Sequence, residues 1–220
     1  MSSFRFRTIV FDLDGTLADT APDIAAALNH ALASVGRAAL SLEAVRGMVG
    51  HGGRVLMQRG LVATGGMDEA AMAAGFPAFI AYYEAHVCDF SLAYPGATGA
   101  LDALRDQGIS LAVCTNKPEH LARGLIEALG WRDRFAAIVG GDTVATTKPD
   151  PAMLHLAIER AGGGQVAMVG DSIVDVQTAR AAGVPCVAVS FGFADRPADQ
   201  LGADAVIDDY DALLPTLAIL

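Results

Sequence analysis

Two aspartates that end an apolar run have the clearest chemical meaning in this sequence. Residues 9–16 read Ile-Val-Phe-Asp-Leu-Asp-Gly-Thr, so Asp12 and Asp14 directly follow a short hydrophobic segment. Side chains two residues apart in an extended chain point to the same side. Two carboxylates placed in this way repel each other unless a cation separates them, and Mg²⁺ prefers oxygen ligands and bridges to phosphate. The pattern favours a metal-assisted phosphate site over the plain alternative, a strand followed by an Asp-Gly turn.

Two further segments place a hydroxyl group and a lysine after predicted strands. Thr115 is followed by Asn116, Lys117 and Pro118, and the free N–H groups of a helix start can cradle a phosphate. Lys148 precedes Pro149, where its ammonium group can neutralise a phosphoryl oxygen and a carboxylate. The alternatives are a simple helix cap and an exposed loop lysine. Asn116 is a better candidate than Lys117 to line a site.

A fourth segment reads Gly-Asp-Ser-Ile-Val-Asp over residues 170–175. Asp171 follows a predicted strand, and Asp175 lies four residues later on the same face of a helix that begins there. A metal ligand and a carboxylate that supports it fit this spacing. The alternative is a helix cap with an acidic first turn. Four such segments, each at the end of a strand, favour one shared site for phosphate chemistry.

Short apolar strands alternate with helices and would position these segments. We predict strands at residues 8–13, 110–115, 136–140, 166–170 and 185–189, and a weaker one at 205–207. We predict helices at residues 99–107, 119–129, 151–161, 174–182 and 210–217. The alternation predicts an α/β fold with a Rossmann-like parallel sheet and helices on both faces. Ligands bind such sheets at the carboxyl ends of the strands.

A stretch of about 70 residues interrupts this alternation and contains no convincing strand. It predicts helices at residues 22–35, 41–49, 53–63 and 68–86. We therefore predict a core made of residues 1–18 and 94–220, with an all-helical domain of residues 19–93 inserted into it. Tyr-Pro-Gly at 94–96 marks the return to the core, and we expect hinges at residues 18–22 and 93–96.

Composition excludes several classes of function. The net charge of −10 argues against nucleic-acid and anionic-membrane partners. With 53% hydrophobic and 18% charged residues, the 220-residue chain predicts a folded globular protein. No apolar run approaches the roughly 18 residues of a membrane span, and no signal-peptide core precedes Asp12, so we expect a cytoplasmic protein. Three scattered cysteines are typical of reduced thiols and not of a zinc site.

The four motifs together resemble those of the haloacid dehalogenase superfamily phosphatases over essentially the full chain. The match consists of DxDGT at residues 12–16, the hydroxyl of Thr115, Lys148, and GDxxxD at residues 170–175. The helical insertion resembles the cap domain of that superfamily. Among the phosphatases of that superfamily, the phosphoglycolate phosphatases are the most similar. The similarity lies in the segments around Asp12, Thr115 and Lys148 and in Gly-Gly-Asp at 140–142.

This resemblance implies Mg²⁺-dependent hydrolysis of a small anionic phosphomonoester, with 2-phosphoglycolate as the first choice. Asp12 is then the nucleophile that forms an aspartyl-phosphate, and Asp14 is the general acid and base. Thr115 and Lys148 offset the charge of the phosphoryl oxygens. The resemblance assigns Mg²⁺ to the side chains of Asp12 and Asp171 and to the backbone carbonyl of Asp14, with Asp175 supporting this shell.

Substrate specificity is expected to lie in the inserted domain. The Gly-His-Gly-Gly-Arg run at residues 50–54 opens a helix, so its N–H groups can hold a small carboxylate and Arg54 can add a charge. We take Gly52, Arg54 and Asn116 as candidate substrate-binding residues. A flexible hinge or a helix cap explains the glycines equally well. We assign no role to His51.

Other functions share the same core motifs. A phosphatase acting on a sugar phosphate or on pyrophosphate needs the same residues, and so does a β-phosphoglucomutase-like phosphomutase. Such mutases more often carry valine where Thr16 stands, which weakly favours hydrolysis. A dehalogenase has no use for the acid Asp14, and a non-catalytic protein would be expected to lose members of the set. The sequence is compatible with a monomer or a homodimer.

Overall fold

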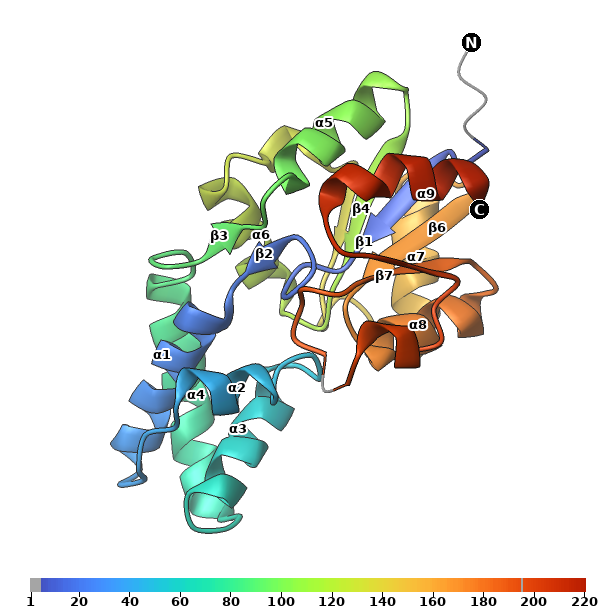
Figure 1. Ribbon diagram of the computed structural model, residues 1–220. Helices are drawn as coiled ribbons and strands as arrows, with labels where there is room; N and C mark the ends of the chain where they lie inside the picture. Colours follow the sequence, from blue (N-terminus) through green and yellow to red (C-terminus); the bar gives the residue numbers. More distant parts are fainter. Residues whose placement is uncertain (1–4, 195) are drawn as a thin grey trace.

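The computed structural model describes residues 5–194 and 196–220 (Figure 1). Its main sheet has the strand order β5-β4-β1-β6-β7-β8, and every neighbouring pair is parallel. The strands are β1 (Thr8–Phe11), β4 (Ser110–Cys114), β5 (Ala137–Val139), β6 (Val166–Gly170), β7 (Cys186–Val189) and β8 (Ala205–Ile207). All six predicted strands are confirmed. The five strands from β5 to β7 in the sheet order are apolar runs that are almost wholly buried, whereas the edge strand β8 leaves Val206 exposed.

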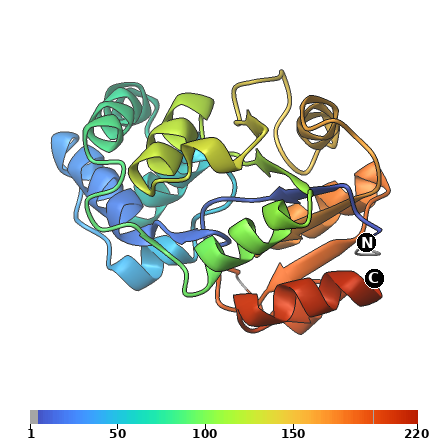
Figure 2. The same ribbon diagram turned by 90° about the horizontal axis from the view of Figure 1, so that it is seen from above.

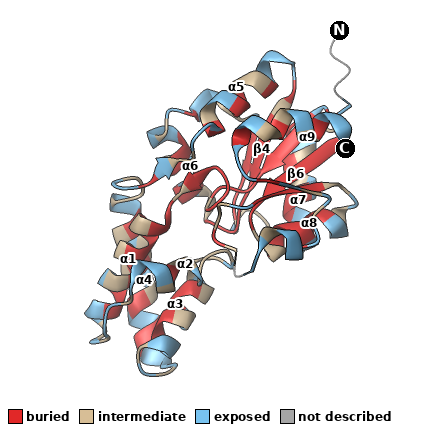
Figure 3. Ribbon diagram, viewed as in Figure 1, coloured by how far each residue is buried: buried red, intermediate tan, exposed pale blue. Residues whose placement is uncertain are grey.

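Helices cover both faces of this sheet, as predicted. In β1, Ile9 and Phe11 pack on one face and Val10 packs on the other. The first face contacts α5 (Ala97–Asp106), α6 (Glu119–Ala128) and α9 (Leu213–Ile219), and the second contacts α7 (Ala152–Arg160) and α8 (Ile173–Ala182). Figure 2 shows α9 and α7 on opposite sides of the strands, and Figure 3 shows the buried strands between them. The predicted last helix consists of a 3₁₀ turn, Tyr210–Ala212, followed by α9.

The first four of the five helices between β1 and β4 form a separate helical unit beside the sheet (Figure 1). They are α1 (Ala21–Ser34), α2 (Leu42–Arg46), α3 (Gly53–Ala63) and α4 (Glu69–Ala85). Side chains such as Leu28, Met57 and Phe79 give this unit an apolar core of its own. In the part of the chain that the structure describes, no helix is both long enough and apolar enough to cross a membrane.

Two short strands that the sequence did not reveal connect the helical unit to the sheet. β2 (Ala18–Asp19) pairs antiparallel with β3 (Leu92–Ala93), so the expectation of no strand in this region was wrong at β3. Strands of two residues are too short to show a period of two. Asp23 fixes the second connection, because its buried carboxylate accepts hydrogen bonds from the backbone N–H groups of Phe90 and Ser91 and from the Ser91 hydroxyl.

Candidate active site

Three of the motifs meet at the carboxyl ends of the central strands. The register of the sheet places Phe11 beside Val113 of β4 and beside Val169 of β6. Asp12, Thr115 and Asp171 follow these strands, so all three lie at one edge of the sheet. The buried positions of these side chains show that parallel strands, and not a surface turn, set their arrangement.

Lys148 is buried between two of the carboxylates. Its Nζ lies 2.8 Å from Oδ1 of Asp12 and 2.6 Å from Oδ1 of Asp175. Burial alone would lower the pKa of this lysine, but the two carboxylates outweigh that effect and raise it. Lys148 is therefore a permanent cation at the site, and the exposed-lysine alternative does not describe it.

Asp12 is a buried carboxylate with a raised pKa. Burial is the largest cause, Lys148 opposes it, and the negative charge of Asp175 adds to it, which places the pKa at about 6. The side chain is therefore ionised at neutral pH, as a nucleophile must be, although its surroundings disfavour the charge.

Asp171 is held by hydrogen bonds to both of its oxygens. Oδ1 accepts from the Thr16 hydroxyl at 3.0 Å, and Oδ2 accepts from the backbone N–H of Phe193 at 2.7 Å. A Cβ at Gly15 would lie 2.4 Å from Oδ2, and Gly15 has φ +84°, so only glycine fits beside this carboxylate. Burial, followed by the charges of Asp175 and Asp12, raises the pKa of Asp171 well above its usual range.

Asp175 is fully buried and supports Lys148. Its Oδ2 accepts from the backbone N–H and the hydroxyl of Ser172, at 3.1 and 2.6 Å, while its Oδ1 faces the lysine. A Cβ at Gly170 would lie 2.4 Å from the Cβ of Asp175. The glycine of the GDxxxD motif therefore makes room for its last aspartate.

The carboxylates of this cluster fit a divalent cation. Asp12, Asp171 and Asp175 each offer an oxygen within 4.8 Å of the others, and all three are buried. Lys148 neutralises only part of the charge that these carboxylates carry when all three are ionised, so a divalent cation would stabilise their ionised forms. Hard carboxylate oxygens are the donors that Mg²⁺ prefers. The residues present can therefore hold such an ion.

Asn116 connects its own loop to the Lys148 loop and to the Gly50 loop, and both polar atoms of its side-chain amide take part in hydrogen bonds. Its Oδ1 accepts from the backbone N–H of Lys148 at 2.9 Å. Its Nδ2 donates to the carbonyl of Lys148 at 3.2 Å and to that of Gly50, in the helical unit, at 3.1 Å. The structure thus places Asn116 where it fixes the Lys148 loop and the Gly50 loop.

Asp14 forms an ion pair with the second lysine of the site. Nζ of Lys117 lies 2.8 Å from Oδ1 of Asp14, and the lysine side chain is only 2% exposed. The same Nζ donates a hydrogen bond to the hydroxyl of Tyr83, at the end of α4. A residue of the helical unit therefore reaches the reaction centre through Lys117.

A small cavity of about 40 Å³ lies between the sheet and the helical unit. Its lining includes Asp12, Asp14, Thr115, Asn116, Lys117, Tyr83 and Gly52. Gly52 has φ +84° and packs close to the backbone of Asn116. Arg54, the other candidate from this loop, does not line the cavity: it is exposed, and its guanidinium lies 5.3 Å from the ring centroid of Phe76.

Comparison with known proteins agrees with this geometry. The family model for haloacid dehalogenase-like hydrolases matches residues 6–183. The chain belongs to this family. A phosphoglycolate phosphatase of Agrobacterium fabrum is 46% identical over 94% of this chain and 91% of the relative, and one of Rhodospirillum rubrum is 44% identical over 94% and 89%. The resemblance found from the motifs is confirmed, and the chain is a phosphatase of this hydrolase family.

Solved structures of this hydrolase family share the whole architecture. A predicted phosphoglycolate phosphatase from Haemophilus somnus 129pt superimposes with a TM-score of 0.92 at 32% identity, covering 98% of this chain and 99% of that one. CbbY from Rhodobacter sphaeroides, solved in complex with phosphate, gives a TM-score of 0.83 at 25% identity and covers 98% and 100%. The helical unit is therefore part of the shared architecture.

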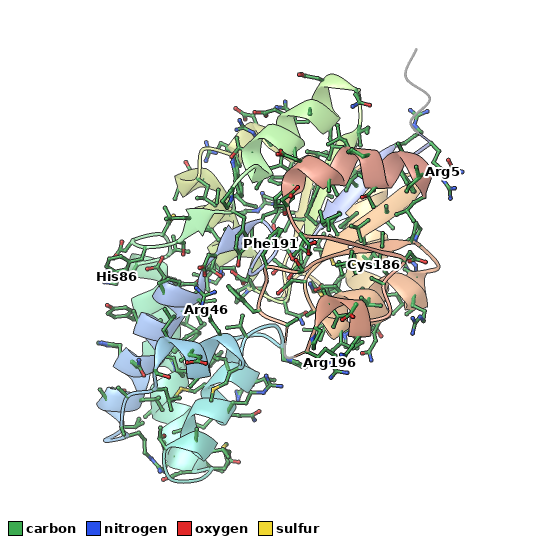
Figure 4. The ribbon with its side chains drawn as sticks, viewed as in Figure 1. Arg5, Arg46, His86, Cys186, Phe191 and Arg196 are labelled. Atoms are coloured by element: carbon green, nitrogen blue, oxygen red, sulfur yellow. The ribbon has the colours of Figure 1, made fainter. Side chains whose placement is uncertain are left out.

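Arg46, which was not predicted as a site residue, lies between the helical unit and the sheet (Figure 4). It forms an ion pair with Asp19 of β2, and its guanidinium lies 5.3 Å from the ring centroid of Phe193, whose backbone holds Asp171. Tyr83, which lines the cavity, was also not predicted as a site residue. No periodicity distinguishes either residue, because both gain their position only when the helical unit folds against the sheet.

Proposed function

We propose that this phosphatase hydrolyses 2-phosphoglycolate to glycolate and phosphate, with Mg²⁺, through an aspartyl-phosphate on Asp12. The observation that carries the proposal is the small cavity beside Asp12 and Asp14. One water needs roughly 10–15 Å³ measured in this way, so about 40 Å³ leaves room for only a few heavy atoms. A two-carbon leaving group suits this small space better than a hexose does. The names of the related phosphatases point to the same substrate.

Each residue of the site has a role in this reaction. A carboxylate oxygen of Asp12 attacks phosphorus, and the bond from phosphorus to the ester oxygen breaks. Asp14 gives its proton to the departing glycolate oxygen and then takes a proton from the water that hydrolyses the aspartyl-phosphate. Lys148 and Thr115 stabilise the charge on the phosphoryl oxygens.

Mg²⁺ would be held by the side chains of Asp12 and Asp171 and by the backbone carbonyl of Asp14, with Asp175 supporting the shell. When bound, it supplies positive charge to the phosphoryl group. The closeness and burial of the carboxylates of Asp12, Asp171 and Asp175 support this assignment.

We further propose that residues 19–93 act as a cap, with hinges at the connections around β2 and β3. The cavity between the helical unit and the sheet supports this role, because closing it excludes water during the first step. The measurement that tests it is the position of the helical unit with and without a phosphate analogue. An unchanged position would count against the hinges.

Phosphate release from a panel of phosphomonoesters tests the proposed function. We expect a preference for 2-phosphoglycolate over hexose phosphates and pyrophosphate of at least about tenfold, or about 1.4 kcal/mol in transition-state binding. We expect activity with Mg²⁺ and none with EDTA. Broad or sugar-selective release would keep the mechanism and reject this substrate, and an isomerised sugar phosphate among the products would indicate a mutase.

Replacing Asp14 with asparagine should slow hydrolysis in proportion to the basicity of the leaving group. Glycolate is a basic leaving group that needs the proton of Asp14, whereas p-nitrophenolate leaves without one. We expect a loss of about 10²- to 10⁴-fold for 2-phosphoglycolate and a much smaller loss for p-nitrophenyl phosphate. Single-turnover rates with both substrates measure this difference. Equal losses would contradict the acid role.

A further inference from the structure

The chain contains only two lysines, Lys117 and Lys148, and both are buried at the active site. Lys148 faces Asp12 and Asp175 and takes part in the proposed chemistry. The reaction as described leaves Lys117 without a task. Of the described residues that line the cavity, Lys117 is the only cation.

The position of Lys117 beside Asp14 matches the structure of the substrate. Asp14 donates its proton to the ester oxygen of 2-phosphoglycolate, so this oxygen must lie next to Asp14. One methylene group separates that oxygen from the carboxylate of the substrate. The ammonium group that lies 2.8 Å from Asp14 is therefore within reach of the carboxylate when the phosphoryl group is at Asp12.

We propose that Lys117, together with the hydroxyl of Tyr83, binds the carboxylate of the substrate and so determines specificity for small phosphorylated acids. This inference rests on the proposed function. The ammonium group has three protons, of which Asp14 and Tyr83 accept two. The third is available to the substrate.

Tyr83 contributes a second donor from the helical unit. Its hydroxyl accepts a hydrogen bond from Lys117 and keeps its own proton to donate. Burial, with the nearby carboxylates of Asp14 and Asp23, raises the pKa of this phenol well above its usual range, so the proton stays in place. The centroid of the Tyr83 ring also lies 4.4 Å from Nζ of Lys117, a cation–π contact that helps to hold the lysine in place.

The remaining walls of the cavity strengthen this charge pairing. Ile24, Leu56, Phe79 and Leu121 line the same space and keep it apolar. A charge-assisted hydrogen bond is stronger in such surroundings than in water. A substrate without the carboxylate would leave the lysine without that partner, so the site would discriminate against it.

The test compares 2-phosphoglycolate with ethyl phosphate, which carries a methyl group in place of the carboxylate. Lys117→Met should lower kcat/KM for 2-phosphoglycolate about thirtyfold more than for ethyl phosphate, because both esters lose the contact of Lys117 with Asp14 but only 2-phosphoglycolate also loses a partner for its carboxylate. Tyr83→Phe should lower the ratio of kcat/KM for 2-phosphoglycolate to that for ethyl phosphate by about tenfold. Arg132→Met, at an exposed ion pair distant from the site, removes the same charge and should change neither value.

Two outcomes in this assay would overturn the inference. Equal losses on both substrates would make Lys117 a positioning residue for Asp14 alone. Loss of the preference in Arg54→Met instead of Lys117→Met would assign the carboxylate to the start of α3. Lys117→Gln serves as a second variant if the methionine protein does not fold.

Binding to the Mg²⁺-loaded protein separates this inference from the proposed function. Calorimetry would compare 3-phosphonopropionate, a non-hydrolysable analogue of the substrate, with propylphosphonate, which lacks the carboxylate. We expect at least tenfold tighter binding of 3-phosphonopropionate and loss of that difference in Lys117→Met. A wild-type protein that releases no phosphate from either ester would reject the proposed function, whereas equal binding of the two phosphonates would reject the role of Lys117.

Discussion

Asp12→Asn is expected to lower kcat for every phosphomonoester by at least about a thousandfold, because an amide cannot attack phosphorus. The substitution preserves the shape of the side chain, and an amide oxygen can still accept a hydrogen bond from Lys148. The measurement is the rate of phosphate release by the variant, after mass spectrometry has confirmed that residue 12 is asparagine. Turnover near that of the parent protein would refute the assignment of Asp12 as nucleophile.

The same variant should be at least as stable as the parent protein. Asp12 has a pKa of about 6 in the folded protein against an ordinary value of 3.8, so folding favours its protonated form. The parent protein in EDTA therefore loses stability as the pH rises from about 4 to about 6, whereas Asp12→Asn lacks this loss. Urea denaturation across that range provides the measurement. A less stable variant at pH 7.5 would show that the loss of activity reflects damage to the fold.

The sequence predicted the sheet and its catalytic edge because both depend on local patterns. Each central strand is a short apolar run, and the polar residue that follows it, such as Asp12 or Asp171, marks the carboxyl end. Parallel pairing then brings these ends together without any further information. The glycines of the motifs have an equally local explanation, since Gly15 and Gly170 make space for neighbouring carboxylates.

The part of the site that faces the helical unit could not be predicted in this way. Lys117 and Tyr83 are 34 residues apart and meet only because α4 packs against the loop after β4. The sequence therefore ranked Asn116 above Lys117, although the structure commits the amide of Asn116 to loop contacts. Arg54 was selected for its charge, but the fold places it over Phe76 and outside the cavity.

Replacing Lys148 with methionine should reduce both activity and stability. The side chain retains a similar length, but the cation between Asp12 and Asp175 disappears. Loss of one charge-stabilising donor typically lowers kcat by about 10²- to 10³-fold. Removing one partner of a buried ion pair typically costs about 3–5 kcal/mol in the free energy of unfolding. Steady-state kinetics and urea denaturation at pH 7.5 measure the two effects.

A second substitution separates the electrostatic cause from a packing defect. Asp175 has Lys148 as its buried cation, so Asp175→Asn in the Lys148→Met background removes a charge that has lost its partner. The double variant should recover part of the lost stability and none of the lost activity, because Asp12 still lacks its cation. Lowering the pH through the pKa of Asp12, about 6, should also narrow the stability deficit of Lys148→Met, since protonation of Asp12 removes its repulsion with Asp175. A deficit that stays constant with pH and in the double variant would mean that Lys148 stabilises the fold through packing and not through its charge.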